Sequence, residues 1–361
     1  MARTDMTPKA PDSVCLLRLS ALGDCANVVP IVHTLQAHWP HTRIGWVINR
    51  VEAALVGDLP GVDFFVMDKR AGRAGLKALR RQLRDERFEV LLHMHASWRA
   101  NRVSRLVRAR RRIGFNAQRT RDCQNWFVNE RIEPPAQRHV VDGFFAFVDK
   151  LGPHEPVYDW RLPISADDHA RAAELLGTDP APVLFISPCS SHPRRNWLAE
   201  RYAAVADYAQ RVHGMRCVVV GGPSAAERRM GDAIANAMHG QMLNLIGQTS
   251  LKQLLALFER GRVLLSPDSG PAHMANACGI DVISLHAATD SRRSGAYLSR
   301  SLCVDYFAEA AQRFRNATPD GLAWGTRIED DDNVMALIPV TAVNARIDQV
   351  LGAPERRQRQ V

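Results

Sequence analysis

Two stretches of the sequence contain side chains that could act as a general base or bind an anion. Each stretch lies between an apolar run and the amphipathic run that follows it. The first carries Gly23 and Asp24 after the apolar residues 14–19. A carboxylate at such a turn lies at the sheet edge where ligands bind, close to the positive end of the following helix. Asp24 is therefore a candidate general base. The alternative is a helix N-cap, which only satisfies backbone amide donors.

The second stretch, Ser-Pro-Asp-Ser-Gly-Pro-Ala-His at residues 266–273, is the strongest local signal. Ser269 and Gly270 offer a hydroxyl and unhindered backbone N–H groups at a helix start. Pro271 suits the first helical position, and His273 lies within the first turn. Such an arrangement suits a diphosphate. The alternative is an ordinary capped helix whose histidine fills a polar pocket.

Three more polar loops follow predicted strands, at residues 187–197, 220–227 and 286–295. In the first, Ser187 and Arg195 are candidates for contact with phosphate oxygens, which arginine can hold bidentately. The Gly-Gly-Pro of the second would let a base or ribose approach the backbone, although such turns are also common without a ligand. The third loop gathers polar groups at the same edge, where it could equally be loop structure alone.

The histidine, glycine and cysteine patterns exclude several classes of site. His93 and His95 would share one face of a strand, but no third ligand is near them, so we predict no metal site. The sequence has neither the G-x-G-x-x-G of a dinucleotide site nor the G-x-S-x-G of a serine hydrolase. Its seven cysteines form no C-x-x-C pair, so we expect reduced thiols.

Short apolar runs alternate with amphipathic stretches, the pattern of βα units that build parallel sheets. The predicted strands are residues 14–19, 43–48, 63–67, 88–94, 112–115, 183–187, 215–220, 242–245, 262–266 and 281–285. The predicted helices are residues 27–38, 74–87, 97–108, 199–212, 225–238, 251–259 and 271–278. Breakers at 152–156 and 177–182 mark a linker region.

A chain of 361 residues suits two domains of ordinary size. Hydrophobic residues make up 46% of it, which indicates a globular protein. No apolar run approaches the roughly 18 residues of a membrane span, and the N-terminus lacks the apolar stretch of a secretory signal. We therefore expect a cytoplasmic protein.

Two motifs resemble the lipopolysaccharide heptosyltransferases of glycosyltransferase family nine. They are Leu-Arg-Leu-Ser-Ala-Leu-Gly-Asp at residues 17–24, followed by Pro30, and Asp-Ser-Gly-Pro-Ala-His-Met-Ala at 268–275. Further similar segments are residues 112–115, 139–142, 187–188, 195–197 and 285–287. The likeness covers roughly residues 14–295.

The resemblance implies an α/β protein of GT-B architecture, with two Rossmann-like domains whose parallel sheets face a central cleft. Residues 1–160 would form the acceptor-side domain, and residues 161–330 the nucleotide-sugar-binding domain. Residues 331–361 would form a helix that crosses back to the first domain, ending in a frayed tail. The implied reaction is transfer of heptose, with inversion, from ADP-heptose to a sugar of the lipopolysaccharide inner core, with no metal ion and no resident cofactor.

The resemblance also implies roles for individual residues. Asp24 stands at the place of the general base. Arg195 stands where family members commonly have lysine near the diphosphate, and Ser224 or Glu227 stands where an acidic residue often contacts the donor ribose. The expected donor contacts are Ser187, Arg195, Gly222, Ser224, Glu227, Asp268, Ser269, Gly270 and His273. The expected acceptor contacts are Arg18, His95, Arg99 and Arg102.

The positive charge is concentrated in residues 69–112. This segment holds fifteen Lys and Arg against three Asp and Glu, hence +12, while the whole chain carries +9. It predicts an anionic partner, either lipid phosphate, nucleic acid or a phosphosugar, and the alternative is a solvated helix face. The resemblance favours a phosphorylated lipid or glycan acceptor, with peripheral contact at the inner membrane face and no nucleic acid.

Two other functions stay open on the sequence. The first is a glycosyltransferase of the same fold that uses another nucleotide-sugar, such as a UDP-sugar, for a surface glycan. The second is a non-enzymatic protein whose residues 99–112 bind nucleic acid or membrane. No nucleic-acid-binding module and no interleaved aromatic residues accompany these arginines, which argues against this second function.

Overall fold

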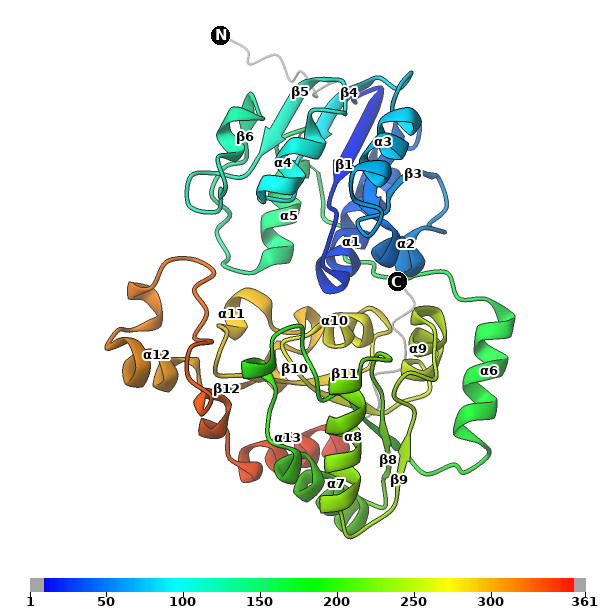
Figure 1. Cartoon of the computed structure of the whole chain (residues 1–361), viewed down its shortest axis with the longest axis vertical. Helices are drawn as coiled ribbons and strands as arrows, with labels where there is room; N and C mark the ends of the chain where they lie inside the picture. The colour runs from blue at the N-terminus through cyan, green and yellow to red at the C-terminus, as the bar shows by residue number, and fades with distance from the viewer. Residues whose placement is uncertain (1–9, 153, 354–361) are drawn as a thin grey trace. The chain divides into compact units, whose positions relative to one another are not determined.

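The computed structural model describes residues 10–152 and 154–353, which belong to two compact units, Met1–Pro163 and Ile164–Val361 (Figure 1). We call them the N-terminal and the C-terminal unit. Each contains one six-stranded parallel sheet with helices on its faces. The predicted α/β class is therefore confirmed. The expectation that the two sheets face a central cleft stays a prediction.

The sheet of the N-terminal unit has the strand order β3-β2-β1-β4-β5-β6. Its strands are β1 (Ser13–Leu17), β2 (Arg43–Asn49), β3 (Val62–Met67), β4 (Phe88–Leu92), β5 (Ala109–Gly114) and β6 (Glu130–Arg131). Its helices are α1 (Leu22–His38), α2 (Arg50–Val56), α3 (Gly72–Gln82), α4 (Trp98–Ser104), α5 (Val140–Asp149) and the 3₁₀ turn η1 (Gln124–Trp126). The chain order reverses at β1, so polar residues after β1 and β4 meet at a topological switch point.

The helices of this unit cover its sheet in two groups. α1 packs against α5 and α2. Leu79 of α3, Leu83 after it, and Ala100 and Val103 of α4 belong to one apolar cluster with the alternate residues Cys15 and Leu17 of β1 and Phe65 and Met67 of β3. Alternate residues of a strand lie on one face, so α3 and α4 cover the same face of the sheet.

The sheet of the C-terminal unit has the order β12-β11-β10-β7-β8-β9. Its strands are β7 (Val183–Ile186), β8 (Arg216–Val219), β9 (Met242–Asn244), β10 (Val263–Pro267), β11 (Asp281–His286) and β12 (Val304–Asp305). Its α-helices are α6 (Ala166–Leu176), α7 (Ala199–His213), α8 (Ala225–Ala237), α9 (Leu251–Phe258), α10 (Gly270–Ala277), α11 (Ser291–Ser294), α12 (Phe307–Arg315) and α13 (Val340–Gly352). Its 3₁₀ turns are η2 (Pro193–Arg195), η3 (Tyr297–Leu302), η4 (Pro319–Gly321) and η5 (Val334–Leu337).

Several predicted elements need correction. Helix α1 begins at Leu22, five residues before the predicted start, because the small residues of its first turn are buried against the sheet. The region between the predicted breakers holds α6, capped by Ser165, whose hydroxyl accepts from Asp168 N. Strand β4 ends at Leu92, so His93 and His95 lie in the loop after it.

The last helix, α13, packs on the C-terminal unit. It contacts α7, β11 and β12, and it buries Val343, Ile347 and Val350 in the core there. The expected crossing of residues 331–361 back to the first domain stays a prediction, and residues 354–361 lie outside the described part of the chain. No helix among the described residues is both long and apolar enough to span a membrane.

One enclosed ion pair ties α13 to the start of two strands. Arg262 Nη1 lies 2.7 Å from Asp281 Oδ2, and the two side chains are 9% and 5% exposed. The same guanidinium donates to the Val350 carbonyl of α13. We predict that Asp281→Ala lowers the free energy of unfolding by about 3–5 kcal/mol, because it leaves a buried guanidinium unpaired.

Urea unfolding followed by circular dichroism measures this effect. The control is Asp320→Ala in the same unit, which removes an exposed partner of Arg292 and is expected to change the free energy by less than about 1 kcal/mol. Equal effects of the two substitutions would contradict the prediction.

Candidate active site

The turn between β10 and α10 forms the centre of a polar cluster in the C-terminal unit. Ser269 is the N-cap of α10, but its side chain makes no capping hydrogen bond. Its hydroxyl instead lies 2.7 Å from the Ser266 hydroxyl. Pro271 occupies the first turn, as predicted from the sequence. The N–H groups of this turn are therefore left for an anion, and the helix dipole favours negative charge there.

Asp268 is a largely buried carboxylate next to this turn, with 11% of its side chain exposed. Burial alone would raise its pKa, but the positive charges of His286, His273, Arg293 and Arg195 outweigh burial and lower the pKa to about 2. Its Oδ2 accepts from the Ser294 hydroxyl at 2.9 Å, and its Oδ1 lies 3.9 Å from His273 Nε2. Asp268 is thus ionised at neutral pH and orients cationic groups around the start of α10.

Arg195 is nearly buried, in contrast to its half-exposed neighbour Arg194. Its Nη2 donates to the Ser191 hydroxyl at 2.8 Å, and its Nη1 lies 3.5 Å from the Asp268 carbonyl oxygen. Its Nε forms an ion pair with Glu329 Oε1 at 2.9 Å, without the angle of a hydrogen bond. The guanidinium is therefore held from three sides beside the β10–α10 turn.

The turn between β8 and α8 presents the glycine pair and an acidic residue. The Glu227 carboxylate accepts from Gly222 N, and its Oε1 accepts from the Ser224 hydroxyl at 3.1 Å. Ser224 caps α8 by accepting from Glu227 N at 3.2 Å. A Cβ on Gly221 would lie 2.6 Å from a Glu227 oxygen, so a side chain there would displace the carboxylate from this position. Glu227 is the acidic side chain at this turn, while Ser224 serves as the helix cap.

Strand order brings these two turns to the same edge. β7 lies between β10 and β8, and Ser187, which follows β7, is buried and donates its N–H to the Leu265 carbonyl at 3.0 Å. The carboxyl ends of parallel strands meet at one edge, so Ser187 lies between the Asp268 turn and the Gly222 turn. The nine residues predicted to bind the donor thus come from three neighbouring strand ends.

In the N-terminal unit, Asp24 lies in the first turn of α1 and is not its N-cap. The N-cap is Ala21, whose N–H donates to Asp24 Oδ2 at 3.4 Å. Arg18 Nη2 forms an ion pair with the same oxygen. The Asp24 side chain is 30% exposed. Its carboxylate is therefore oriented by Arg18 and still reachable from solvent.

Arg18 is itself fixed by three neighbouring elements. Its Nη1 donates to the Met94 carbonyl at 2.7 Å, and its own carbonyl accepts from Trp46 Nε1 at 3.2 Å. Its guanidinium lies 5.4 Å from the centre of the Phe144 ring. Arg18 thus connects the ends of β1 and β4 to Asp24, and its contact with the acceptor stays a prediction.

His95 is a neutral histidine next to this pair. Burial, together with the positive charge of Arg18, lowers its pKa to about 2. Leu19 N donates to His95 Nδ1 at 3.2 Å, so the proton of the neutral ring is on Nε2. His95 can therefore donate a hydrogen bond through Nε2. His93 is fully buried, and burial lowers its pKa to about 3.

The other two predicted acceptor arginines, Arg99 and Arg102, differ in their surroundings. Arg99 is half-buried at the start of α4, and its positive charge acts on both His95 and Glu52. Arg102 is exposed in the last turn of α4. The structure therefore groups Arg18, His95 and Arg99 at the ends of β1 and β4, with Arg102 farther along the surface of α4.

Sequence reasoning missed three carboxylates. Glu52 is buried in α2, and burial raises its pKa against the opposing charges of Arg99 and Lys69. Glu329 pairs with Arg195, and Asp332 pairs with Arg194 at 2.7 Å. Two features of the sequence could have indicated these residues. One is the single acid within the mostly apolar segment Arg50–Val56, and the other is the run of four acidic residues at 329–332, which could pair with Arg194 and Arg195.

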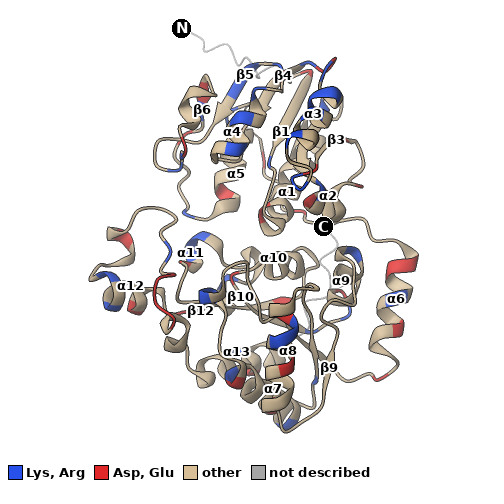
Figure 2. Ribbon diagram, in the orientation of Figure 1, with Lys and Arg blue, Asp and Glu red and all other residues tan. Residues whose placement is uncertain are grey.

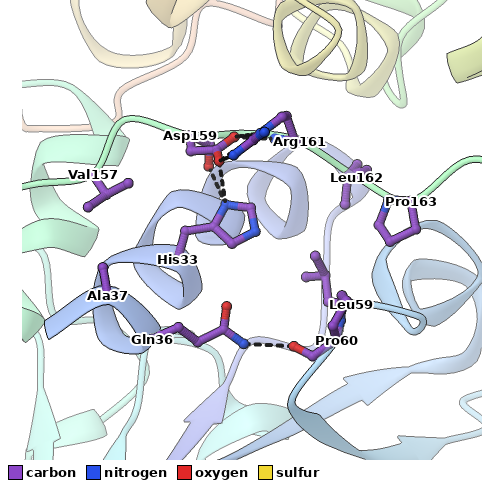
Figure 3. Close-up of a pocket in the computed structure, with 10 residues that line it drawn as sticks. All are labelled: His33, Gln36, Ala37, Leu59, Pro60, Val157, Asp159, Arg161, Leu162 and Pro163. Atoms are coloured by element: carbon purple, nitrogen blue, oxygen red, sulfur yellow. Dashed lines mark hydrogen bonds and ion pairs between the residues drawn. The ribbon is translucent and has the colours of Figure 1, made fainter. Parts of the chain in front are cut away.

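The predicted donor residues lie in the C-terminal unit, and Asp24 and the predicted acceptor residues lie in the N-terminal unit. The N-terminal unit also contains a pocket of about 500 Å³, and no predicted site residue lines it (Figure 3). Its walls come from α1, the turn before β3 and residues 157–163. Figure 3 shows the His33 ring directed at Asp159, 2.9 Å from its carbonyl oxygen, and Gln36 donating to the Pro60 carbonyl at 2.7 Å. The first contact holds residues 157–163 on α1, and the second ties α1 to the turn before β3. The described residues contain no cluster of three potential metal ligands.

Comparisons with known proteins match most of the chain. The lipopolysaccharide core heptosyltransferase OpsX of Haemophilus influenzae is 36% identical over 93% of this chain and 96% of its own length. A family 9 glycosyltransferase from Veillonella parvula has a TM-score of 0.74 at 21% identity, covering 94% of this chain and 97% of its own. Heptosyltransferase WaaC of E. coli, solved with ADP, has a TM-score of 0.71 at 18% identity, covering 94% and 99%.

WaaC has also been solved with ADP-2-deoxy-2-fluoro heptose. These structural matches confirm the GT-B fold. The model of glycosyltransferase family 9 (heptosyltransferase) matches residues 76–321, which include the Asp268 turn, and the resemblance stated from the two motifs is confirmed. The chain is a glycosyltransferase that belongs to glycosyltransferase family 9.

Proposed function

We propose that this enzyme transfers heptose from ADP-heptose to a sugar of the lipopolysaccharide inner core, with inversion at the anomeric carbon. The observation that carries the proposal is the 36% identity with a lipopolysaccharide core heptosyltransferase over 96% of that protein's length. The ADP and the ADP-heptose analogue held by WaaC support the identity of the donor. The enzyme would act in the cytoplasm, peripherally at the inner membrane, on a phosphorylated lipid or glycan acceptor.

The cluster around α10 suits the diphosphate of the donor. Uncapped N–H groups at the start of α10, the Ser269 hydroxyl, His273 and the enclosed Arg195 guanidinium offer donors to phosphate oxygens. As the glycosidic bond to the diphosphate breaks, negative charge grows on the departing ADP, and the same donors stabilise it. Since this chain supplies positive charge at that point, we propose that the reaction needs no metal ion.

Asp24 suits the role of general base. The acceptor hydroxyl oxygen attacks the anomeric carbon, and its proton passes to the Asp24 carboxylate while the ADP oxygen leaves from the opposite side. Attack opposite the leaving group inverts the configuration. Arg18 holds the carboxylate in place, and His95, through Nε2–H, and Arg99 offer donors to polar groups of the acceptor.

Glu227 and the two glycines suit the nucleoside part of the donor. The carboxylate lies at the end of β8, where Gly221 and Gly222 carry no side chain that would block a ribose. Since Ser224 is engaged in capping α8, we propose Glu227 rather than Ser224 as the ribose contact. Ser187 would contact the donor between this turn and the Asp268 turn.

Turnover with defined substrates tests the function. The chain is incubated with ADP-heptose and a lipid A acceptor bearing a truncated inner core, and the product is analysed by mass spectrometry. We expect the acceptor to gain one heptose and ADP to be released at the same rate in excess EDTA. UDP-sugars in place of ADP-heptose are expected to give no product. Transfer from a UDP-sugar only, or loss of activity in EDTA, would contradict the proposal.

Asp24→Asn tests the general base. The amide keeps the shape of the side chain but does not take up the proton, so we expect kcat to fall by at least about a hundredfold while ADP binding is retained. If Asp24 serves only the helix start, the variant loses about 1 kcal/mol of stability and keeps its activity. Steady-state kinetics and a melting curve of the same preparation separate these outcomes.

His273→Ala and Ser269→Leu test the diphosphate site. The first removes a hydrogen-bond donor from the first turn of α10, and the second fills the space before the helix. We expect each to weaken ADP binding by about tenfold or more in calorimetric titration. Ser250→Ala, which removes the cap of α9, is the control and is expected to leave ADP binding unchanged. Unchanged ADP affinity in both site variants would refute the assignment.

A further inference from the structure

The two helices of the basic segment form an outer layer on one face of the sheet of the N-terminal unit. α3 and α4 cover the same face of the sheet, with Leu79, Leu83, Ala100 and Val103 turned inward. The segment after α4 is tied to the end of α3, since Arg108 Nη1 donates to the Arg84 carbonyl at 2.9 Å. Figure 2 shows Lys and Arg on both helices. The outward side of this layer therefore presents the cations of two helices together.

The cations on α3 are exposed and available to a partner. Arg73, Lys77, Arg80 and Arg81 are all exposed, and in the described part of the chain none of their side chains forms an ion pair or a hydrogen bond. The eleven residues of α3 include no acid. A helix face that only keeps a protein soluble is usually interspersed with charges of both signs. This unpaired charge favours an anionic surface as partner.

Two exposed tryptophans lie at the α4 end of the same layer. Trp98 is 52% exposed at the start of α4, and Trp126 is 74% exposed in η1. Phe127, next to Trp126, stacks edge-to-face with Trp98 at 6.2 Å, and the Arg105 guanidinium lies 4.8 Å from the centre of the Phe127 ring. Trp98 thus belongs to an aromatic and cationic cluster with Phe127 and Arg105, and Trp126 directly precedes Phe127 in the chain.

The backbone holds this cluster in place. Trp98 N donates to the Asp122 carboxylate at 2.9 Å, and Asn101 Nδ2 donates to the Asp122 carbonyl at 2.6 Å. Ser97 caps α4 by accepting from Ala100 N at 3.3 Å. These bonds fix α4 against the loop that carries η1. The exposed indoles are therefore held by ordered elements and are not packed in the hydrophobic core.

We propose that the α3–α4 face docks on a bilayer that contains anionic phospholipid. We define this face as Arg73, Lys77, Arg80 and Arg81 on α3 with Trp98, Arg105 and Trp126 at α4 and η1. Indole rings lie at the headgroup level of a bilayer, and each Lys or Arg near an anionic leaflet strengthens binding severalfold. The inference rests on the proposed function in one respect, that the acceptor is anchored in lipid.

Vesicle binding tests the face without donor, acceptor or turnover. The full chain is sedimented with vesicles of phosphatidylcholine alone or mixed equally with phosphatidylglycerol. We expect strong binding to the mixed vesicles and at least about tenfold weaker binding to the neutral ones. Arg80→Glu with Arg81→Glu is expected to reduce binding to mixed vesicles by at least about tenfold. Arg211→Glu with Arg260→Glu changes the net charge equally on exposed arginines of the C-terminal unit and is expected to bind like the parent chain.

The tryptophans are tested separately. Trp98→Ala with Trp126→Ala is expected to weaken binding to mixed vesicles severalfold, with unchanged circular dichroism. In the parent chain, brominated lipid is expected to quench part of the tryptophan fluorescence, since Trp46 and Trp197 are enclosed and the indoles at this face are exposed. Quenching keeps the test valid if the double variant does not fold.

Three results would overturn the inference: equal binding to both kinds of vesicle, equal binding by the α3 variant and its control, or duplex DNA displacing the vesicles from the α3 residues. The last would identify a nucleic-acid face. Vesicle binding without heptose transfer would refute only the proposed function, and heptose transfer without vesicle binding would refute only the docking face.

Discussion

The polar cluster at the start of α10 depends on the ionised, largely buried carboxylate of Asp268. An isolated buried carboxylate is costly, and here His286, His273, Arg293 and Arg195 offset that cost. The same cations are thereby held beside the uncapped start of α10. A diphosphate arriving there meets positive groups already fixed by one anion, so little reorganisation accompanies binding. Asp268 thus acts by positioning the groups that would touch the donor.

A second carboxylate, that of Glu329, further restricts the orientation of the Arg195 side chain. Glu329 pairs with Nε of this guanidinium, which leaves the two terminal nitrogens to Ser191, the Asp268 carbonyl and a ligand. A planar guanidinium fixed along one side presents its other side in a set direction, which a lysine ammonium does not. The position of the guanidinium therefore depends on a carboxylate that lies far away in the sequence.

The positions of the strands and of the α10 start could be predicted from the sequence, whereas the side-chain contacts between residues far apart in the chain could not. Gly-Pro and Ser at the start of α10 mark a helix start locally, and the alternation of apolar runs marks nearly every strand, because these signals depend on neighbours in the chain. The helix α6 was missed because it lies between two breaker segments. Glu52 and Glu329 were missed because their importance comes from Arg99 and Arg195, far away in sequence. The neutral state of His95 likewise follows from burial and from Leu19 N, which no local pattern reveals.

The placement of Asp24 shows how a short turn can hold a carboxylate firmly. Arg18 binds the carboxylate, and Arg18 is in turn fixed by the Met94 carbonyl after β4 and by Trp46 of β2. Three neighbouring strands of the sheet therefore determine where one carboxylate lies. A side chain held by rigid elements keeps its direction better than one on a free loop. The reversal of chain order at β1 makes this possible, because it sets the ends of β1, β2 and β4 side by side around a single turn.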